Sequence, residues 1–390
     1  MTDSTRPAAC WDLFCTVIDN FGDIGVAWRL ARQLADEYRL PLRLWVDDLE
    51  SFARIEARLD PDLDAQTIAG VEIRRWTPGS AQLGAGVEPG EVVIEAFGCR
   101  LPDDFLATMA ACDPAPLWLN LEYLSAEAWV DDCHGMASPH PRLPLTQYFY
   151  FPGFTETSGG LIGERDLPAR RDAFLADTAG LDAYWASLGL PPRVENEMRI
   201  SLFSYETPSL ASLTDAWAAS IAPVTVLVPE GRALAELRRV LGQPLEVPGG
   251  VARRGALAVH ALAMTDQAGY DRLLWACDFN IVRGEDSFLR AQWAARPFLW
   301  HIYRQDEGAH LEKLDAFLER YTQGLAEPAA AALTALSRAF NRDEEVGDAW
   351  RAFGKRREAL AFHAHDWAEK QAAAGDLAGR LVQFVQNRLK

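Results

Sequence analysis

Two carboxylates, Asp19 and Asp23, occupy a glycine-bearing turn in the stretch DNFGDIGVAWRLARQL at residues 19–34. The apolar run before it, residues 13–18, is typical of a buried strand, and the residues after it have a helical period. Such a turn commonly binds phosphate, but carboxylates beside an anion repel it strongly where water is excluded. Paired carboxylates instead suit the binding of a cation or the removal of a proton. We therefore expect a general base or a cation site at this turn.

Two other readings of the turn stay open. Gly22 and Gly25 form only part of a G-x-G-x-x-G fingerprint, while residues 47–48, both aspartate, follow the next strand at about the distance of a ribose-binding residue. A nicotinamide-dependent enzyme is thus a competing hypothesis. The structural alternative is that Asp23 caps the helix and Asp19 is a solvated loop residue.

A second strand-to-helix turn is better suited to an anion. The strand ends at Arg283 and Gly284, and a helix begins near Glu285. Helix N-terminal amides favour phosphate, the Ser287 hydroxyl can add a hydrogen bond, and an arginine binds phosphate bidentately. The structural alternative is a helix capped by Asp286 and Ser287, with Arg283 in a surface ion pair. The sequence indicates a diphosphate site here.

Three further residues could bind a nucleotide base. Phe203 and Tyr205 lie at the end of a predicted strand, where aromatic faces can stack on a base. Gln267 could hydrogen bond to a base edge. Aromatic residues at alternating strand positions are more often core, and a single glutamine is usually a surface residue, so neither signal is specific.

The elements that must position these residues alternate between strands and helices, which indicates an α/β fold. Apolar runs predict strands at the positions 13–18, 42–46, 92–97, 199–206, 224–229, 257–262, 279–284 and 297–303, and a helical period spans 26–38. Residues 135–154, rich in proline, glycine and aromatics, are expected to be irregular. A second alternation begins after LGLPPRVENE, so a domain boundary is expected near 188–197.

Composition narrows the class of protein. The 390 residues are 49% hydrophobic and carry a net charge of -18, which favours two ordinary domains and disfavours nucleic acid as a partner. The six cysteines include no C-x-x-C pair, and His363 and His365 cannot share a helix face, so we expect reduced thiols and no metal site. We find no signal peptide and no run of 18 apolar residues, and therefore expect a cytoplasmic protein without membrane spans.

Two long motifs carry a family resemblance. NFGDIGVAWRLARQL and RGEDSFLRAQWAARPFLWHIYRQDEGAHLEKLDAFL resemble the EarP family, the protein-arginine rhamnosyltransferases that modify elongation factor P. The resemblance runs from WDLFCTVIDNFGDIG to the final helices. It implies a GT-B glycosyltransferase fold, with two Rossmann-like domains facing a central cleft. It also implies an acceptor-binding domain at residues 1–190, completed by a helix at 373–390, and a nucleotide-sugar-binding domain at 195–372.

The resemblance also implies roles for individual residues. The catalytic aspartates of the family fall on Asp19 and Asp23, and the catalytic glutamate falls on Glu285. The donor contacts implied by the family fall on six residues, Phe203, Tyr205, Gln267, Arg283, Asp286 and Ser287. The donor would be dTDP-β-L-rhamnose, the partner elongation factor P, and no cofactor or metal is expected. A single displacement would invert the anomeric carbon, with Asp23 as the base.

Two other functions remain open from the residues alone. One is a nucleotide-sugar transferase with a small-molecule or glycan acceptor. The other is a non-catalytic nucleotide-sugar binder. Release of dTDP distinguishes a transferase, with either a protein or a small acceptor, from a non-catalytic binder, because a binder forms no product.

Overall fold

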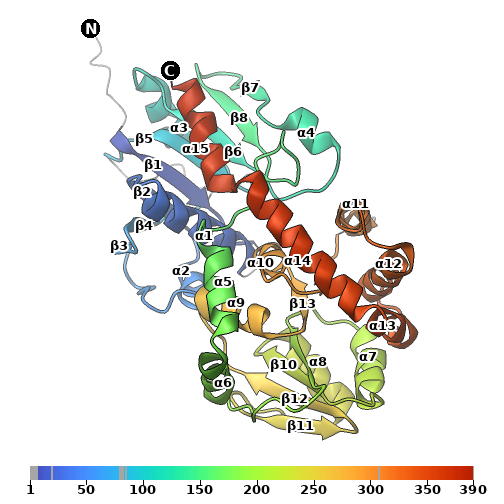
Figure 1. Ribbon diagram of the computed structural model, residues 1–390. Helices are drawn as coiled ribbons and strands as arrows, with labels where there is room; N and C mark the ends of the chain where they lie inside the picture. The colour runs from blue at the N-terminus through green and yellow to red at the C-terminus, as the bar shows by residue number, and fades with distance from the viewer. Residues whose placement is uncertain (1–7, 19–20, 79–82, 84–85, 306–307, 390) are drawn as a thin grey trace. The chain divides into compact units, whose positions relative to one another are not determined.

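The computed structural model describes residues 8–389, apart from 19–20, 79–82, 84–85 and 306–307. Its contacts divide the chain into two compact units, Met1–Arg165 with Ala373–Lys390, and Asp166–Ala372 (Figure 1). The sequence-based boundary near 188–197 lies later than this division. The difference arises because Trp185 and Leu190 are buried in a core cluster with Leu227 and Leu273 of the second unit. A change of strand pattern does not reveal such packing.

The first unit is built on an eight-stranded sheet in the order β3-β4-β2-β1-β5-β6-β8-β7. Its strands are β1 (Ala8–Cys15), β2 (Leu42–Val46), β3 (Ala65–Ile68), β4 (Val71–Arg75), β5 (Gly90–Ala96), β6 (Leu117–Leu121), β7 (Ala137–Pro139) and β8 (Thr146–Tyr150). The two edge strands pair antiparallel and the inner strands pair parallel. Parallel strands place their carboxyl ends at one edge of the sheet, where α/β proteins bind ligands.

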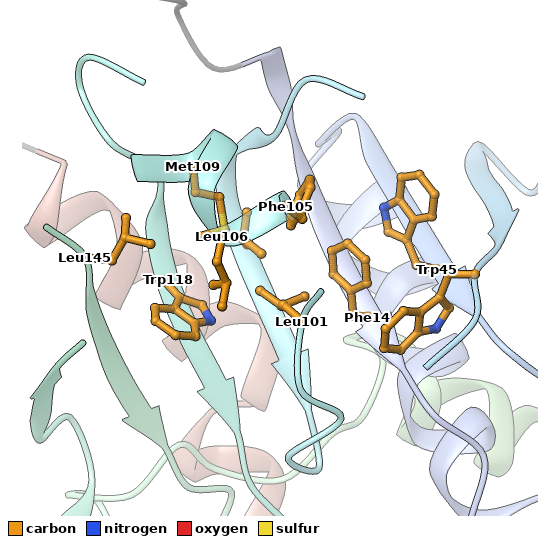
Figure 2. Packing of buried hydrophobic residues seen from close by; sticks show 10 residues of the cluster. Phe14, Trp45, Leu101, Phe105, Leu106, Met109, Trp118 and Leu145 are labelled. Atoms are coloured by element: carbon orange, nitrogen blue, oxygen red, sulfur yellow. The ribbon is translucent and has the colours of Figure 1, made fainter. Parts of the chain in front are cut away.

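Helices cover this sheet and enclose an aromatic core. They are α1 (Gly22–Glu37), α2 (Leu49–Ala53), α3 (Asp103–Ala111), α4 (Trp129–Cys133) and α15 (Leu377–Arg388). In the core, Phe14 of β1 stacks on Trp45 of β2 at a centroid distance of 5.4 Å and contacts Phe105 of α3 at 5.3 Å (Figure 2). Burial of these aromatic rings stabilises the packing of the central strands against α3.

The last helix, α15, belongs to the first unit although it ends the chain. Arg380 donates hydrogen bonds to the backbone oxygens of Thr155 (2.6 Å) and Ser158 (2.8 Å). Phe384 lies against Tyr150 of β8, with ring centroids 5.2 Å apart. Helix α15 is thus held in the first unit by specific contacts.

The second unit holds a six-stranded sheet in the order β11-β12-β10-β9-β13-β14. Its strands are β9 (Met198–Leu202), β10 (Val224–Pro229), β11 (Val251–Arg254), β12 (Leu257–Leu262), β13 (Phe279–Arg283) and β14 (Phe298–His301). Its helices are α5 (Leu167–Ala176), α6 (Thr178–Ser187), α7 (Ser209–Ala218), α8 (Arg232–Leu241), α9 (Gln267–Ala276), α10 (Asp286–Trp293), α11 (Ala309–Tyr321), α12 (Glu327–Asn341), α13 (Gly347–Gly354) and α14 (Arg357–Ala374). All strand pairs except β11–β12 are parallel.

Two local expectations need correction. Residues 135–154 are not wholly irregular, because β7 and β8 pair there at the edge of the first sheet. The first strand ends at Cys15 instead of continuing to Ile18. The backbone amides of Val17 and Ile18 donate to the carboxylates of Asp47 and Asp23, so they leave the sheet ladder. Apolar side chains alone did not reveal this exit.

Candidate active site

The Asp23 carboxylate is buried at the start of α1, with 3% of its surface exposed. Its Oδ2 accepts a hydrogen bond from the Ile18 amide (2.8 Å), and its Oδ1 accepts one from the Tyr123 hydroxyl (2.9 Å). Phe21, and not Asp23, is the N-cap residue of α1, so the helix-cap reading of Asp23 is wrong. Asp19 lies outside the described residues, and its catalytic assignment remains a prediction.

Aromatic residues from neighbouring strands hold Asp23 in place. Tyr123 follows β6 and Phe97 follows β5, and their rings stack at 4.5 Å with an interplanar angle of 19°. Because β1, β5 and β6 are adjacent and parallel, their carboxyl ends meet at one edge. Sequence reasoning missed both rings. The sequence feature that could have indicated them is an aromatic residue shortly after the end of each strand.

Two further carboxyl groups lie near the carboxyl ends of strands in the first unit. Asp47 follows β2, accepts hydrogen bonds from the Val17 amide (2.9 Å) and its neighbour Asp48, and has a pKa raised by burial. Glu122 follows β6 and accepts from Asn120 (2.7 Å), and burial also raises its pKa. This edge is acidic and partly desolvated, which disfavours a phosphate and favours a cationic substrate group such as a guanidinium.

In the second unit, Arg283 lies at the end of β13 against two aromatic rings. Its guanidinium carbon is 4.5 Å from the centroid of Phe203 and 4.8 Å from that of Tyr205. The structure thus brings together three of the residues to which the sequence assigned nucleotide contacts. Cation–π contacts hold the guanidinium in one position. A preorganised guanidinium at the carboxyl edge of a parallel sheet can bind a phosphate.

The turn into α10 has the geometry of an anion site. Gly284 adopts a left-handed φ of 63°, which a side chain would disfavour, and its carbonyl accepts from Trp300 Nε1 (3.0 Å). Glu285 is the N-cap residue, and its side chain makes no capping hydrogen bond. Asp286 and Ser287 form the first turn. The proposed capping by Asp286 and Ser287 is therefore wrong, and the first-turn amides of this helix suit phosphate.

The helix α9 adds Gln267 and Tyr270 to this edge. Gln267 is its first residue and is 6% exposed, while Tyr270, one turn later, contacts Phe203 edge to face at 6.0 Å. Burial raises the pKa of the Tyr270 hydroxyl far above its ordinary value. Sequence reasoning missed Tyr270, although its spacing from Gln267 places both on one helix face.

A buried ion pair joins α9 to α10 behind these residues. Arg290 donates from Nε to Asp271 Oδ1 (2.9 Å) and from Nη2 to Asp271 Oδ2 (2.6 Å). The side chains are 1% and 4% exposed. The paired geometry sets the position of both helices relative to each other, and so of Gln267 and Ser287.

Beside Tyr205, a cavity of about 250 Å³ opens at the carboxyl end of β14. His301 lines it, and burial lowers the pKa of this histidine to about 4, so its ring is neutral near pH 7. The His301 ring contacts Tyr205 edge to face at 5.3 Å. The cavity is also lined by Arg232, Tyr303 and Asp343. Polar and aromatic groups together suit a hydroxylated ligand.

Metal-binding clusters and membrane-spanning helices are both absent from the described residues. No group of three or more histidine, cysteine, aspartate or glutamate side chains in this part of the chain could hold a metal ion. In the same part, no helix has the length and apolarity that a membrane span requires.

Comparison with known proteins covers both units. Residues 11–386 match the family of EarP, the elongation factor P (EF-P) rhamnosyltransferase. The chain belongs to the EarP family. It is 51% identical to a protein-arginine rhamnosyltransferase of Pseudomonas putida and 47% identical to that of Pseudomonas aeruginosa, in each case over 98% of this chain and 100% of the relative.

A solved structure agrees with membership of the EarP family. One, described as the structural basis for EarP-mediated arginine glycosylation of translation elongation factor EF-P, has a TM-score of 0.70 and 38% identity, covering 97% of this chain and 99% of that one. The spinosyn forosaminyltransferase SpnP has a TM-score of 0.51 at 10% identity, covering 99% and 100%, and shows similarity of fold alone. The fold is that of the GT-B glycosyltransferases, which confirms the predicted fold class.

Proposed function

We propose that this protein transfers L-rhamnose from dTDP-β-L-rhamnose to an arginine of elongation factor P, with inversion at the anomeric carbon. Membership of the EarP family supports the reaction class. The observation that carries the acceptor assignment is the buried Asp23 carboxylate, held by Tyr123 and the Ile18 amide at an acidic edge. Such an edge suits a guanidinium and repels a phosphate.

The donor binds through the second unit. Arg283 and the first-turn amides of α10 contact the diphosphate, and Gln267 hydrogen bonds to the thymine. Phe203 and Tyr205 position Arg283 and border the nucleotide, while the backbone amide of Asp286 and the hydroxyl of Ser287 complete the phosphate contacts. These fixed donors stabilise the charge that develops on the leaving dTDP, so the reaction needs no metal ion.

The acceptor nitrogen needs a base because a guanidinium has a pKa above about 12 and delocalised lone pairs. As the nitrogen attacks C1, a proton passes to Asp23, the C1–N bond forms and the C1–O bond to dTDP breaks. Asp19 orients the guanidinium, and Glu285 positions the sugar. Attack opposite the leaving group converts a β donor into an α-rhamnosyl arginine. A translation factor as acceptor places the reaction in the cytoplasm.

Intact mass spectrometry tests this proposal. Elongation factor P from the same source is incubated with the protein and dTDP-β-L-rhamnose, with Asp23→Asn and Asp36→Asn in parallel. Asp36 lies on the same helix, but 77% of its side chain is exposed, so its variant controls for carboxylate loss on α1. We expect one added deoxyhexose with the wild type and Asp36→Asn, and a loss of rate on the order of 10²-fold with Asp23→Asn.

Four outcomes would count against the proposal. Normal turnover by Asp23→Asn would exclude Asp23 as the base. A β-linked product, read by NMR, would exclude a single displacement. Release of dTDP without modification of elongation factor P would favour the small-molecule or glycan acceptor, and donor binding without any dTDP release would favour a non-catalytic binder.

A further inference from the structure

A second cavity, of about 320 Å³, lies in the second unit, away from the carboxyl edge that holds Arg283. Its lining comes from the segments that precede β9, β13 and β14 and from the first turn of α14. Because these strands are parallel, their amino ends lie at the sheet edge opposite Arg283. The charged residues that line the cavity are Arg193, Arg296 and Arg357, with Glu197, Asp278 and Glu358.

Two of the acidic groups already have basic partners. Asp278 accepts from Arg193 Nη1 (2.9 Å) and from the Arg199 amide (2.7 Å). Glu197 accepts from Arg199 Nη2 (3.1 Å) and from the Thr225 hydroxyl (2.5 Å). The third acidic group, Glu358, is exposed in the first turn of α14.

Fewer of the arginines in the lining than of the carboxylates have an ion-pair partner. Within the described part of the chain, no carboxylate lies within 4.0 Å of the guanidinium nitrogens of Arg296 or Arg357. Arg296 donates from Nε to the Trp275 carbonyl (3.2 Å), which fixes the guanidinium at the cavity wall. This backbone contact orients the guanidinium of Arg296, which forms no ion pair with a carboxylate of the described residues.

Burial affects the arginines at and near the cavity, whose charged lining consists of three arginines and three carboxylates. Burial lowers the pKa of Arg296, the nearby charges of Arg193 and Arg171 act in the same direction, and the charge of Asp278 opposes them. Arg199 does not line the cavity but bonds to Asp278 and Glu197 of the lining; it is fully buried, and in the described structure its Nε and Nη1 make no hydrogen bond. A desolvated cation that lacks full pairing, as Arg296 does, gains from a bound anion.

We propose that this cavity is a binding site for a small oxyanion of the phosphate type, held by the guanidinium groups of Arg296 and Arg357. The first turn of α14 adds backbone amides on the same side, where the helix dipole favours negative charge. The site is separate from the diphosphate contacts at Arg283, since it lies at the other end of the same strands. Its occupant stabilises the second unit without entering the reaction.

Inorganic phosphate is the probe, measured by calorimetric titration at constant ionic strength. The titrations use Arg283→Ala as the background, so that binding at the donor edge does not contribute. Arg357→Glu changes an exposed residue and should leave the fold intact, and Arg296→Gln is the second test variant. Arg338→Glu, at an exposed position on α12, is the matched charge-reversal control.

We expect phosphate to bind the Arg283→Ala background and to raise its Tm. Adding Arg357→Glu or Arg296→Gln should weaken binding at least about tenfold, the effect of losing one charge-assisted contact. Adding Arg338→Glu should leave binding unchanged. Absence of phosphate binding in the Arg283→Ala background, or binding that survives both Arg357→Glu and Arg296→Gln, would overturn the proposal.

Discussion

Replacing Arg290 by methionine would remove half of the buried ion pair that joins α9 to α10. The side chains of Arg290 and Asp271 are 1% and 4% exposed and share two hydrogen bonds. Loss of one partner leaves the other charge buried without compensation, which costs about 3–5 kcal/mol. For a unit of about 200 residues, this lowers Tm by roughly 6–20 °C. Asp271→Leu should have a similar effect.

The double variant Arg290→Met/Asp271→Leu separates charge burial from packing. It removes both charges together, so we expect its stability to lie within about 2 kcal/mol of the wild type. Urea unfolding, followed by circular dichroism and tryptophan fluorescence, measures the three variants. Arg338→Met is the control, because the Arg338–Asp315 pair is 46% and 43% exposed and should contribute no more than about 1 kcal/mol.

The functional consequence is specific to the donor. Because the pair positions α9 and α10, each single variant should also weaken dTDP binding, and the double variant should recover part of it. The reasoning would be refuted if each single variant cost less than about 1 kcal/mol, the range of an exposed pair. Additive effects in the double variant would equally show that the two charges are not coupled.

Three further predictions concern single residues. Arg283→Ala should weaken dTDP binding by about 10- to 100-fold in calorimetric titration, because a charge-assisted contact is lost; unchanged affinity would remove its phosphate role. Tyr123→Phe should lower kcat about tenfold with unchanged dTDP affinity, because Asp23 loses one of the hydrogen bonds that orient it; a normal kcat would contradict this. Burial lowers the pKa of His301 to about 4 from an ordinary 6.5, so the unfolded chain binds the extra proton between these values and stability falls as pH drops through them. Between pH 7 and pH 4, the free energy of unfolding of His301→Phe should fall by roughly 3 kcal/mol less than that of the wild type. An unaltered pH dependence would show that His301 is not buried as a neutral ring.

Much of the fold could be predicted because local pattern and burial agree. The apolar runs at 42–46, 224–229 and 257–262 became β2, β10 and β12 with the predicted bounds, since both faces of an inner strand are covered. The prediction of strand ends failed where hydrogen bonds to residues distant in sequence determine the backbone conformation. Thr16–Ile18 are apolar enough for a strand, yet the Val17 amide bonds to Asp47, thirty positions away.

The candidate site divides in the same way. The sequence indicated Asp23, Arg283 and the helix start at Ser287, because a strand, a turn and a helix in succession predict which residues lie at the carboxyl end of the strand. Nothing in the sequence indicated that Tyr123 binds Asp23. That contact depends on the strand order β1-β5-β6, which brings together strand ends about a hundred residues apart in the chain.

By itself, the sequence determined the α/β class, the family and the types of residue at the two turns. Only the tertiary structure decided which charges are buried and with which partners. The sequence pattern does not distinguish Arg290 and Asp271 from ordinary helix-surface residues, and the arginines that line the second cavity lie on three separate segments of the chain. Helix and strand patterns follow from neighbours in sequence, whereas desolvation of a charge depends on everything that folds around it.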